Sequence, residues 1–266
     1  MPNCLFSHLG VFFWLSLIAT FTTFEAQSQE IAVKEPASEE ITVDQADVDV
    51  PEELLSPAKR KAAIDRWEED ITAFESLDQA TPGPDGAILL VGSSSIRLWE
   101  GAGEALAPYP VIRRGYGGAK FSDLYVFAKR LIEPHSFRAI VCFVGNDISG
   151  KKTDHEVADV EKWVRSIVSI VRDHQPDAVT LLVEVTPTPS RFDAWPKIRQ
   201  LNSMLREVAL TEPSVSFVAT AEFYLDRDDQ PRRSLFRDDN LHLNETGYQI
   251  WGSLIKRRLD EVLAAE

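Results

Sequence analysis

Two short segments, far apart in the chain, carry side chains that could perform nucleophilic catalysis. Three serines at 93–95 follow an apolar run at 87–91 after a single glycine, and Asp239 stands three residues before His242 near the end of the chain. A serine hydroxyl becomes an effective nucleophile when a neighbouring base takes its proton, and a carboxylate holds that base in the required tautomer. The sequence therefore contains every part of a Ser-His-Asp site.

The elements that must position these side chains follow an alternating pattern of short apolar runs and longer amphipathic segments. A helix is predicted to begin at Ser56-Pro57, where serine can cap and proline can occupy the first turn. The predicted strands are 87–91, 111–114, 139–144, 179–185 and 215–218. The predicted later helices are 121–132, 156–173, 195–208 and 246–263. Continuous buried strands separated by helices predict an α/β fold, a three-layer α/β/α sandwich around a mostly parallel five-stranded sheet.

The candidate side chains fall at one edge of this predicted sheet. Ligands of such open sheets bind beyond the carboxyl ends of the strands. Ser94 follows the first strand, Gly118 the second and Asn146 the third, while the segment 239–242 precedes the last helix. We expect these residues to converge. The simpler alternative for the serines alone is that they cap a short helix.

Four separated blocks resemble those of the SGNH hydrolases, also called GDSL-type esterases and lipases. The G-x-S-x-G elbow of α/β-hydrolases is absent, because Ile96 stands where its second glycine would be. The first block is similar to that of a subgroup resembling the catalytic subunits of platelet-activating-factor acetylhydrolase. Two positions depart from the family pattern: Ser93 replaces an aspartate and Arg113 an asparagine. The blocks are VGSSSIRLW at 91–99, RRGYGG at 113–118, GND at 145–147 and DNLHLN at 239–244.

The resemblance covers about residues 57–266 and implies a flavodoxin-like SGNH fold and a set of roles. It implies Ser94 as nucleophile, His242 as base and Asp239 as its carboxylate partner. Spacing alone leaves Asp238 as a rival for Asp239, and the family register favours Asp239. The implied oxyanion hole consists of the N–H groups of Ser94 and Gly118 and the side-chain amide of Asn146, with no metal and no cofactor.

The resemblance implies a serine esterase that hydrolyses carboxylic esters through an acyl-enzyme. An acetyl or other short acyl group is expected, on a small molecule or a carbohydrate. Three alternatives remain open at this point. An acyltransferase would use the same triad, and an inactive binding or structural module would keep only the scaffold. A metal-dependent phosphoesterase could use the acidic residues and His242 as ligands, although such sites usually contain more clustered ligands.

Several other residues receive a provisional interpretation. Arg191 ends the stretch PTPSR at 187–191 and either contacts substrate or anchors its loop. Asp147 is expected to support the loop of Asn146. Surface positions are predicted for three histidines, and Cys142, flanked by apolar residues, is interpreted as core packing. The three histidines are His135, His155 and His174.

The N-terminal part of the 266-residue chain differs in composition from the rest. Residues 1–28 are predicted to be a signal peptide or, alternatively, an uncleaved N-terminal anchor, because 9–24 is an uncharged apolar run. Residues 29–56 are predicted to be an acidic disordered linker. The expected location is therefore secreted or periplasmic, with membrane anchoring as the alternative. The net charge of −14 argues against nucleic acid as a partner, and oligomeric state is not predicted.

Overall fold

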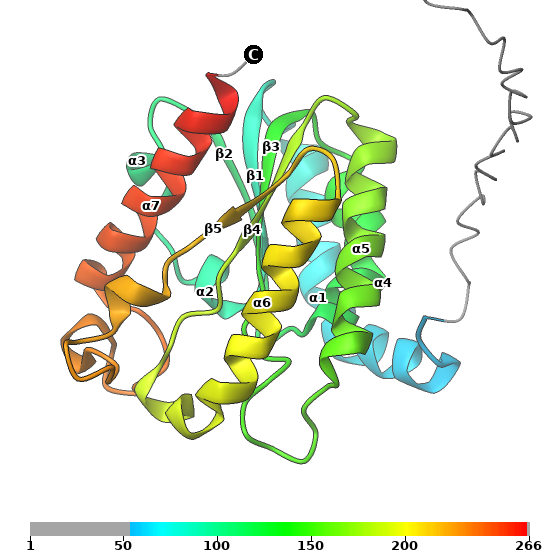
Figure 1. Ribbon diagram of the computed structural model, residues 1–266. Coiled ribbons are helices and arrows are strands. Elements are labelled where there is room, and N and C mark those ends of the chain that lie inside the picture. The colour runs from blue at the N-terminus through cyan, green and yellow to red at the C-terminus, as the bar shows by residue number, and fades with distance from the viewer. Residues whose placement is uncertain (1–53, 265–266) are drawn as a thin grey trace, which may run out of the picture. The chain divides into compact units, whose positions relative to one another are not determined.

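Five parallel strands form the central sheet of residues 54–264, which are the residues that the computed structural model describes (Figure 1). The strand order is β2-β1-β3-β4-β5, and every pair of neighbours is parallel. The expected sheet of five strands is confirmed. The strands are β1 (Ala87–Gly92), β2 (Val111–Gly115), β3 (Phe137–Phe143), β4 (Val179–Val183) and β5 (Val215–Val218).

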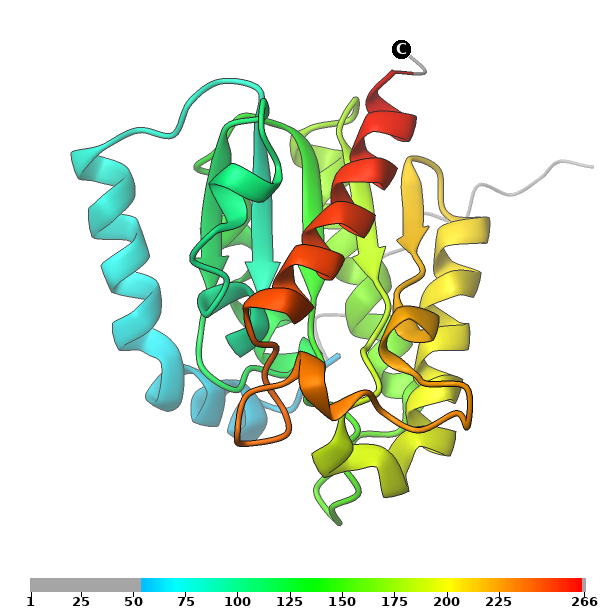
Figure 2. The ribbon, with the colours of Figure 1, turned by 90° about the vertical axis from the view of Figure 1, so that its left-hand side faces the viewer.

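Helices cover both faces of the sheet, which confirms the three-layer architecture (Figure 2). Leu89 and Val91 of β1 contribute to one core and Ile88 and Leu90 to the other, as expected for side chains that alternate along a strand. On the first face lie α1 (Pro57–Ala80), α4 (Phe121–Ile132), α5 (Val157–His174) and α6 (Trp195–Thr211). On the second lie α2 (Ser94–Arg97), α3 (Ala102–Ala105) and α7 (Glu245–Leu263).

Three short 3₁₀ helices, which the sequence patterns did not predict, connect these elements. They are η1 (Pro189–Ala194), η2 (Ala221–Tyr224) and η3 (Arg233–Leu235). Strand β4 is also shorter than predicted, since it ends at Val183 rather than at Val185. The reason is that the backbone of Val185 pairs with a side chain: its N–H donates to Asn202 Oδ1 at 2.8 Å and its carbonyl accepts from Asn202 Nδ2 at 3.0 Å.

The folded domain begins before the predicted boundary at residue 57. Leu55 is only 5% exposed, and the carbonyl of Leu54 accepts a 3.0 Å hydrogen bond from Trp163 Nε1. Residues 54–56, which the sequence analysis assigned to the acidic linker, therefore pack against the domain. The predicted helix start is confirmed, because Ser56 Oγ accepts from the N–H of Lys59 and Pro57 stands in the first turn.

The predicted signal or anchor at 1–28 and the remainder of the predicted linker, 29–53, lie outside the described residues. Among the helices within 54–264, none has both the length and the apolar character needed to span a bilayer.

Candidate active site

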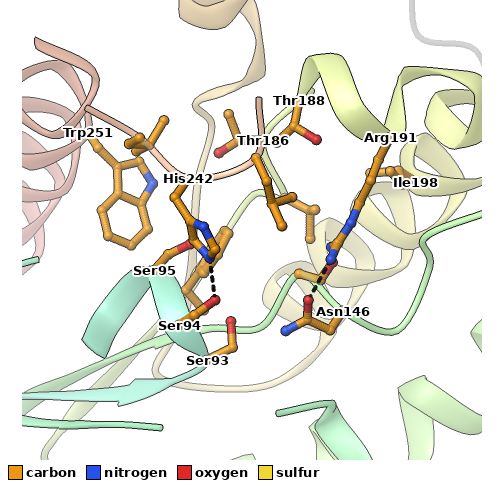
Figure 3. Close-up of a pocket in the computed structure, with 15 residues that line it drawn as sticks. Ser93, Ser94, Ser95, Asn146, Thr186, Thr188, Arg191, Ile198, His242 and Trp251 are labelled. Atoms are coloured by element: carbon orange, nitrogen blue, oxygen red, sulfur yellow. Dashed lines mark hydrogen bonds between the residues drawn. The ribbon is translucent and has the colours of Figure 1, made fainter. Parts of the chain in front are cut away.

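The loops that follow β1, β3 and β4 meet the segment before α7 at one edge of the sheet (Figure 3). Ser94, Asn146, Arg191 and His242 line a single small cavity there. The convergence expected from the sequence is therefore present for Ser94, Asn146 and His242, each of which comes from a different connection between elements.

Ser94 is placed by a close approach of two strands. At the end of β1, Gly92 has φ +139°, and a Cβ atom built on it would lie 1.9 Å from the carbonyl oxygen of Phe143 in β3. Only glycine fits there. The N–H of Ser93 then donates to the same carbonyl at 3.0 Å, and Ser94 begins α2. As the first residue of a helix, Ser94 has an N–H without an intrahelical acceptor.

A continuous pair of hydrogen bonds links Ser94 to His242 and His242 to Asp239. His242 Nε2 lies 2.9 Å from Ser94 Oγ (Figure 3), and His242 Nδ1 lies 2.6 Å from Asp239 Oδ2. An ionised carboxylate only accepts hydrogen bonds, so its contact assigns the imidazole proton to Nδ1. Nε2 is then the acceptor for the serine hydroxyl.

The turn that carries His242 also fixes Asp239. Asp239 Oδ1 accepts from the N–H groups of Leu241 and His242, each at 2.9 Å, and Asn240 between them has φ +56°. Partial burial opposes ionisation of Asp239, but the hydrogen bonds from the His242 side chain and these two N–H groups outweigh it and lower its pKa to about 2. Asp238 meets this turn through its backbone carbonyl, which accepts from Asn240 Nδ2. The geometry thus favours Asp239 over its rival.

Asn146 lines the cavity from the loop after β3, and Gly118 lies in the adjoining loop after β2. Asn146 Nδ2 donates to the carbonyl of Ala119 at 3.0 Å, which joins the two loops. Gly117 has φ +28°, and a Cβ atom built on it would lie 2.1 Å from the indole of Trp67 in α1. The loop of Gly118 therefore rests directly on α1. The contact of Trp67 with this loop could not be predicted, because nothing in the sequence pattern of α1 indicates which loop its side chains contact.

Asp147 supports the loop of Asn146 from the interior of the domain, as expected from the sequence. Its buried carboxylate accepts from the N–H of Phe121 at 3.1 Å and from His155 Nδ1 at 2.9 Å. Burial raises the pKa of Asp147, and the hydrogen bonds from His155 and Phe121 oppose that rise. The surface interpretation was wrong for His155, which is tied to a buried carboxylate. It was also wrong for His135, which is 4% exposed and lies 3.4 Å from Asp78.

Arg191 enters the site from η1 and contacts the loop of Asn146. Its Nη1 donates to the carbonyl of Gly145 at 2.6 Å and its Nη2 to Asn146 Oδ1 at 2.8 Å. Of the two roles left open for Arg191, these contacts show the loop anchor directly. Burial lowers the pKa of the Arg191 guanidinium, opposed by the charge of Asp154.

The cavity beside Ser94 is small, with a volume of about 30 Å³. Apolar side chains form much of its wall, and polar side chains gather near Ser94 and Asn146. The apolar group is Phe143, Val185, Ile198, Leu241, Leu243 and Trp251. Within residues 54–264, no group of three or more His, Cys, Asp or Glu side chains is arranged to hold a metal ion. Cys142 is a free, buried cysteine, consistent with core packing.

Comparison with known proteins places this arrangement among related folds. The profile of the GDSL-like lipase/acylhydrolase family matches residues 80–250. A search of curated proteins found no match. Among solved structures, a protein of Streptococcus pneumonia with the provisional name platelet activating factor is 21% identical, with a TM-score of 0.66 over 77% of this chain and 100% of that one.

Two further solved structures share the fold. A GDSL-like lipase from Bacteroides thetaiotaomicron is 17% identical, with a TM-score of 0.63 over 72% of this chain and 98% of that one. A carbohydrate esterase family 3 protein from Talaromyces cellulolyticus is 14% identical, with a TM-score of 0.52 over 68% of this chain and 99% of that one. Likeness at such low identity shows the fold alone.

Proposed function

Because the chain belongs to the GDSL-like lipase/acylhydrolase family and is an ester-bond hydrolase, we propose that Ser94, His242 and Asp239 are its catalytic triad. The observation that carries this proposal is the unbroken contact from Ser94 Oγ through the imidazole to Asp239, at 2.9 Å and 2.6 Å. A nucleophile, a base and a group that orients the base are the minimum set for covalent catalysis by a serine.

In the proposed reaction His242 Nε2 takes the Ser94 proton while Ser94 Oγ bonds to the ester carbonyl carbon. Asp239 stabilises the imidazolium that forms. As the tetrahedral intermediate collapses, His242 gives its proton to the leaving alcohol and the acyl group stays on Ser94. Water then attacks the acyl-enzyme, with His242 again acting as base, and releases the carboxylic acid.

The oxygen of the tetrahedral intermediate carries a negative charge that needs hydrogen-bond donors. We assign this role to the N–H groups of Ser94 and Gly118 and to Asn146 Nδ2. One hydrogen of Asn146 Nδ2 is used by the carbonyl of Ala119, which leaves the second for the substrate. Preorganised donors of this kind contribute about 3 to 4 kcal/mol each to lowering the barrier.

The size of the cavity favours a short acyl group. A site needs roughly 10–15 Å³ to admit one water molecule, so the 30 Å³ beside Ser94 corresponds to about two waters. An acetyl group adds a methyl to the carbonyl and fits this space, whereas an octanoyl chain would require the surrounding apolar side chains to move. We therefore propose acetyl esters as the preferred substrates.

A carbohydrate is the alcohol we propose. The support is the shared fold with a protein named as a carbohydrate esterase and an acid–base pair open to solvent, with Asp239 48% and His242 20% exposed. An open site gives room for a bulky alcohol on one side while the small cavity holds the acyl group. Access of water to the same site favours hydrolysis over acyl transfer.

The test is hydrolysis of p-nitrophenyl acetate, butyrate and octanoate by the purified protein, followed by acetate release from acetylated oligosaccharides. We expect the rate to fall with chain length. Ser94→Ala should abolish activity, while the matched control Ser95→Ala, whose hydroxyl does not contact His242, should keep most of it. Equal activity of wild type and Ser94→Ala would refute the proposed triad.

We further propose that the protein is exported, on the basis of the apolar run at 9–24 and the acidic stretch that follows. The test is the N-terminal sequence and cell fraction of the protein expressed from the full chain in a bacterium. A start near residue 29 in the extracytoplasmic fraction would support cleavage. A full-length chain in the membrane fraction would support the anchor, and one in the cytoplasm would exclude both.

A further inference from the structure

Asn146 can act as an oxyanion donor only if its side-chain amide faces the right way. The amide has one accepting end, Oδ1, and one donating end, Nδ2, and a flip about its last torsion angle exchanges them. A flipped amide would present an oxygen to the negative oxygen of the intermediate and repel it. What fixes the orientation of this amide therefore decides whether the donor exists.

Two contacts fix the amide, and each permits one orientation only. Arg191 Nη2 lies 2.8 Å from the end assigned as Oδ1, and a guanidinium can only donate (Figure 3). The backbone carbonyl of Ala119 lies 3.0 Å from the end assigned as Nδ2, and a carbonyl can only accept. Donor therefore faces acceptor at both ends, and the reverse orientation would lose both hydrogen bonds.

Arg191 is itself held in place for this task. Its second contact, from Nη1 to the carbonyl of Gly145 at 2.6 Å, engages the residue directly before Asn146. The planar guanidinium thus donates one hydrogen bond to the backbone of Gly145 and another to the side chain of Asn146. Among the described residues, its hydrogen bonds go to these two oxygens and it forms no ion pair with a carboxylate. Its positive charge is therefore stabilised directly by carbonyl and amide oxygens, and from a greater distance by the charge of Asp154.

We propose that Arg191 is a positioning residue of the oxyanion hole, which orients the Asn146 amide and polarises it toward the reacting ester oxygen. A cation on Oδ1 draws electron density from the amide and makes the Nδ2 hydrogen a stronger donor, since hydrogen bonds in a chain strengthen one another. This inference rests on the proposed function: Arg191 would hold the Asn146 amide ready for the negative charge that develops on the ester oxygen.

The role differs in a measurable way from a direct contact with substrate. Stabilisation that appears only in the transition state changes kcat, whereas a contact that is equal in ground and transition states changes KM. A residue that acts through Asn146 should also lose its effect once Asn146 is gone, because coupled residues are non-additive.

The experiment is a double-mutant cycle with Arg191→Met and Asn146→Ala, using p-nitrophenyl acetate. We expect Arg191→Met to lower kcat about tenfold or more, with KM within about twofold. In the Asn146→Ala background it should lower kcat less than about twofold further. Arg191→Lys keeps the charge but loses the planar guanidinium and should fall between wild type and Arg191→Met. Arg199→Met, an exposed arginine eight residues on, is the matched control and should leave kcat unchanged.

A second probe separates this inference from the proposed function. A p-nitrophenyl phosphonate ester bonds to an activated serine and places its phosphoryl oxygen where the ester oxygen would go, with loss of p-nitrophenolate. If the wild-type protein reacts at Ser94 but hydrolyses no ester, the proposed esterase function fails. The double-mutant cycle is then measured with the rate of phosphonylation in place of kcat. Thermal unfolding of each variant confirms that it is folded.

Three results would overturn the inference. The first is a rise in KM without a fall in kcat for Arg191→Met, which would indicate substrate binding. The second is full additivity of the two substitutions, which would show that Arg191 does not act through Asn146. The third is a wild-type protein inert to both probes, because Ser94 would then have no oxyanion hole to serve.

Discussion

The two halves of the site are built in opposite ways. The acid–base half is a four-residue turn at the surface, in which Asp239 is 48% exposed and receives its hydrogen bonds from residues two and three positions along the chain. The donor half, around Gly118 and Asn146, contains the fully buried carboxylate of Asp147, which is hydrogen-bonded to Phe121 and His155 from other segments of the chain. Arg191 lies 45 residues from Asn146 along the chain.

The conformation of the acid–base half therefore depends on its own short sequence, whereas that of the donor half depends on contacts with the rest of the domain. The surface turn needs little more than its own backbone to hold carboxylate and imidazole together. The donor half needs α1, α4 and η1 to be in place before its amides face the substrate. We therefore expect substitutions at the turn to change chemistry alone, and substitutions around the donors to change chemistry and folding together.

The largest expected effect contrasts the two aspartates. Asp239→Asn removes the charge that holds the His242 tautomer and should lower kcat by about 10⁴-fold, with little change in the thermal midpoint. Asp147→Asn keeps an oxygen that can accept from Phe121 and His155, so kcat should fall less than about tenfold. Steady-state kinetics on an acetyl ester checks both. Similar losses of kcat in the two variants would erase the distinction between the halves.

The next effect isolates the donor half. Asn146→Ala removes one oxyanion donor and should lower kcat by about 10²- to 10³-fold. Its matched control is Asn202→Ala, which removes a side chain hydrogen-bonded to the backbone of Val185, two residues beyond the end of β4. The control should cost about 1 to 3 kcal/mol of folding free energy and leave kcat of the folded protein close to wild type. Denaturant unfolding and kinetics, measured together, separate the two.

A smaller effect tests the contact between α1 and the donor loop. Gly117→Ala drives a methyl group into the indole of Trp67 and should cost about 1 to 3 kcal/mol of stability, with kcat lowered several-fold. Gly103→Ala adds the same methyl group to α3, where nothing lies within 4 Å, and should be harmless. If Gly117→Ala lowers stability without touching kcat, α1 supports the fold but not the donors.

The smallest expected effect is in the pH dependence of stability, where the halves should differ in sign. The pKa of Asp239 falls from 3.8 to about 2 on folding, so its stabilisation is full above pH 4 and is lost as pH falls toward 2. Solvent screening of this exposed group keeps the change below about 1 kcal/mol. The pKa of Asp147 is raised on folding, so its ionisation weakens the folded state as pH rises above 4. Unfolding of the two Asn variants across this range should shift in opposite directions.

The same division decides how much the sequence could predict. The blocks around Ser94, Asn146 and His242 are local, and they identified the fold and the residues that meet at the sheet edge. Trp67 beneath Gly117 could not be predicted, because the docking of α1 depends on contacts across the whole first face of the sheet. Likewise the roles of Arg191 and His155 depend on which loop each side chain reaches. Strand β4 ends early because the backbone of Val185 bonds to the side-chain amide of Asn202, 17 residues away.

The placement of acid and base on one turn also has a consequence for chain entropy. Only one long loop must close to assemble the three reacting groups, because Ser94 and His242 are 148 positions apart along the chain. The entropic cost of closure rises slowly with length, by about 0.6 kcal/mol for each doubling. The intervening chain is therefore free to gain or lose surface loops. A short glycine–serine insertion after Arg227, in an exposed turn, should leave kcat unaltered, which kinetics would verify.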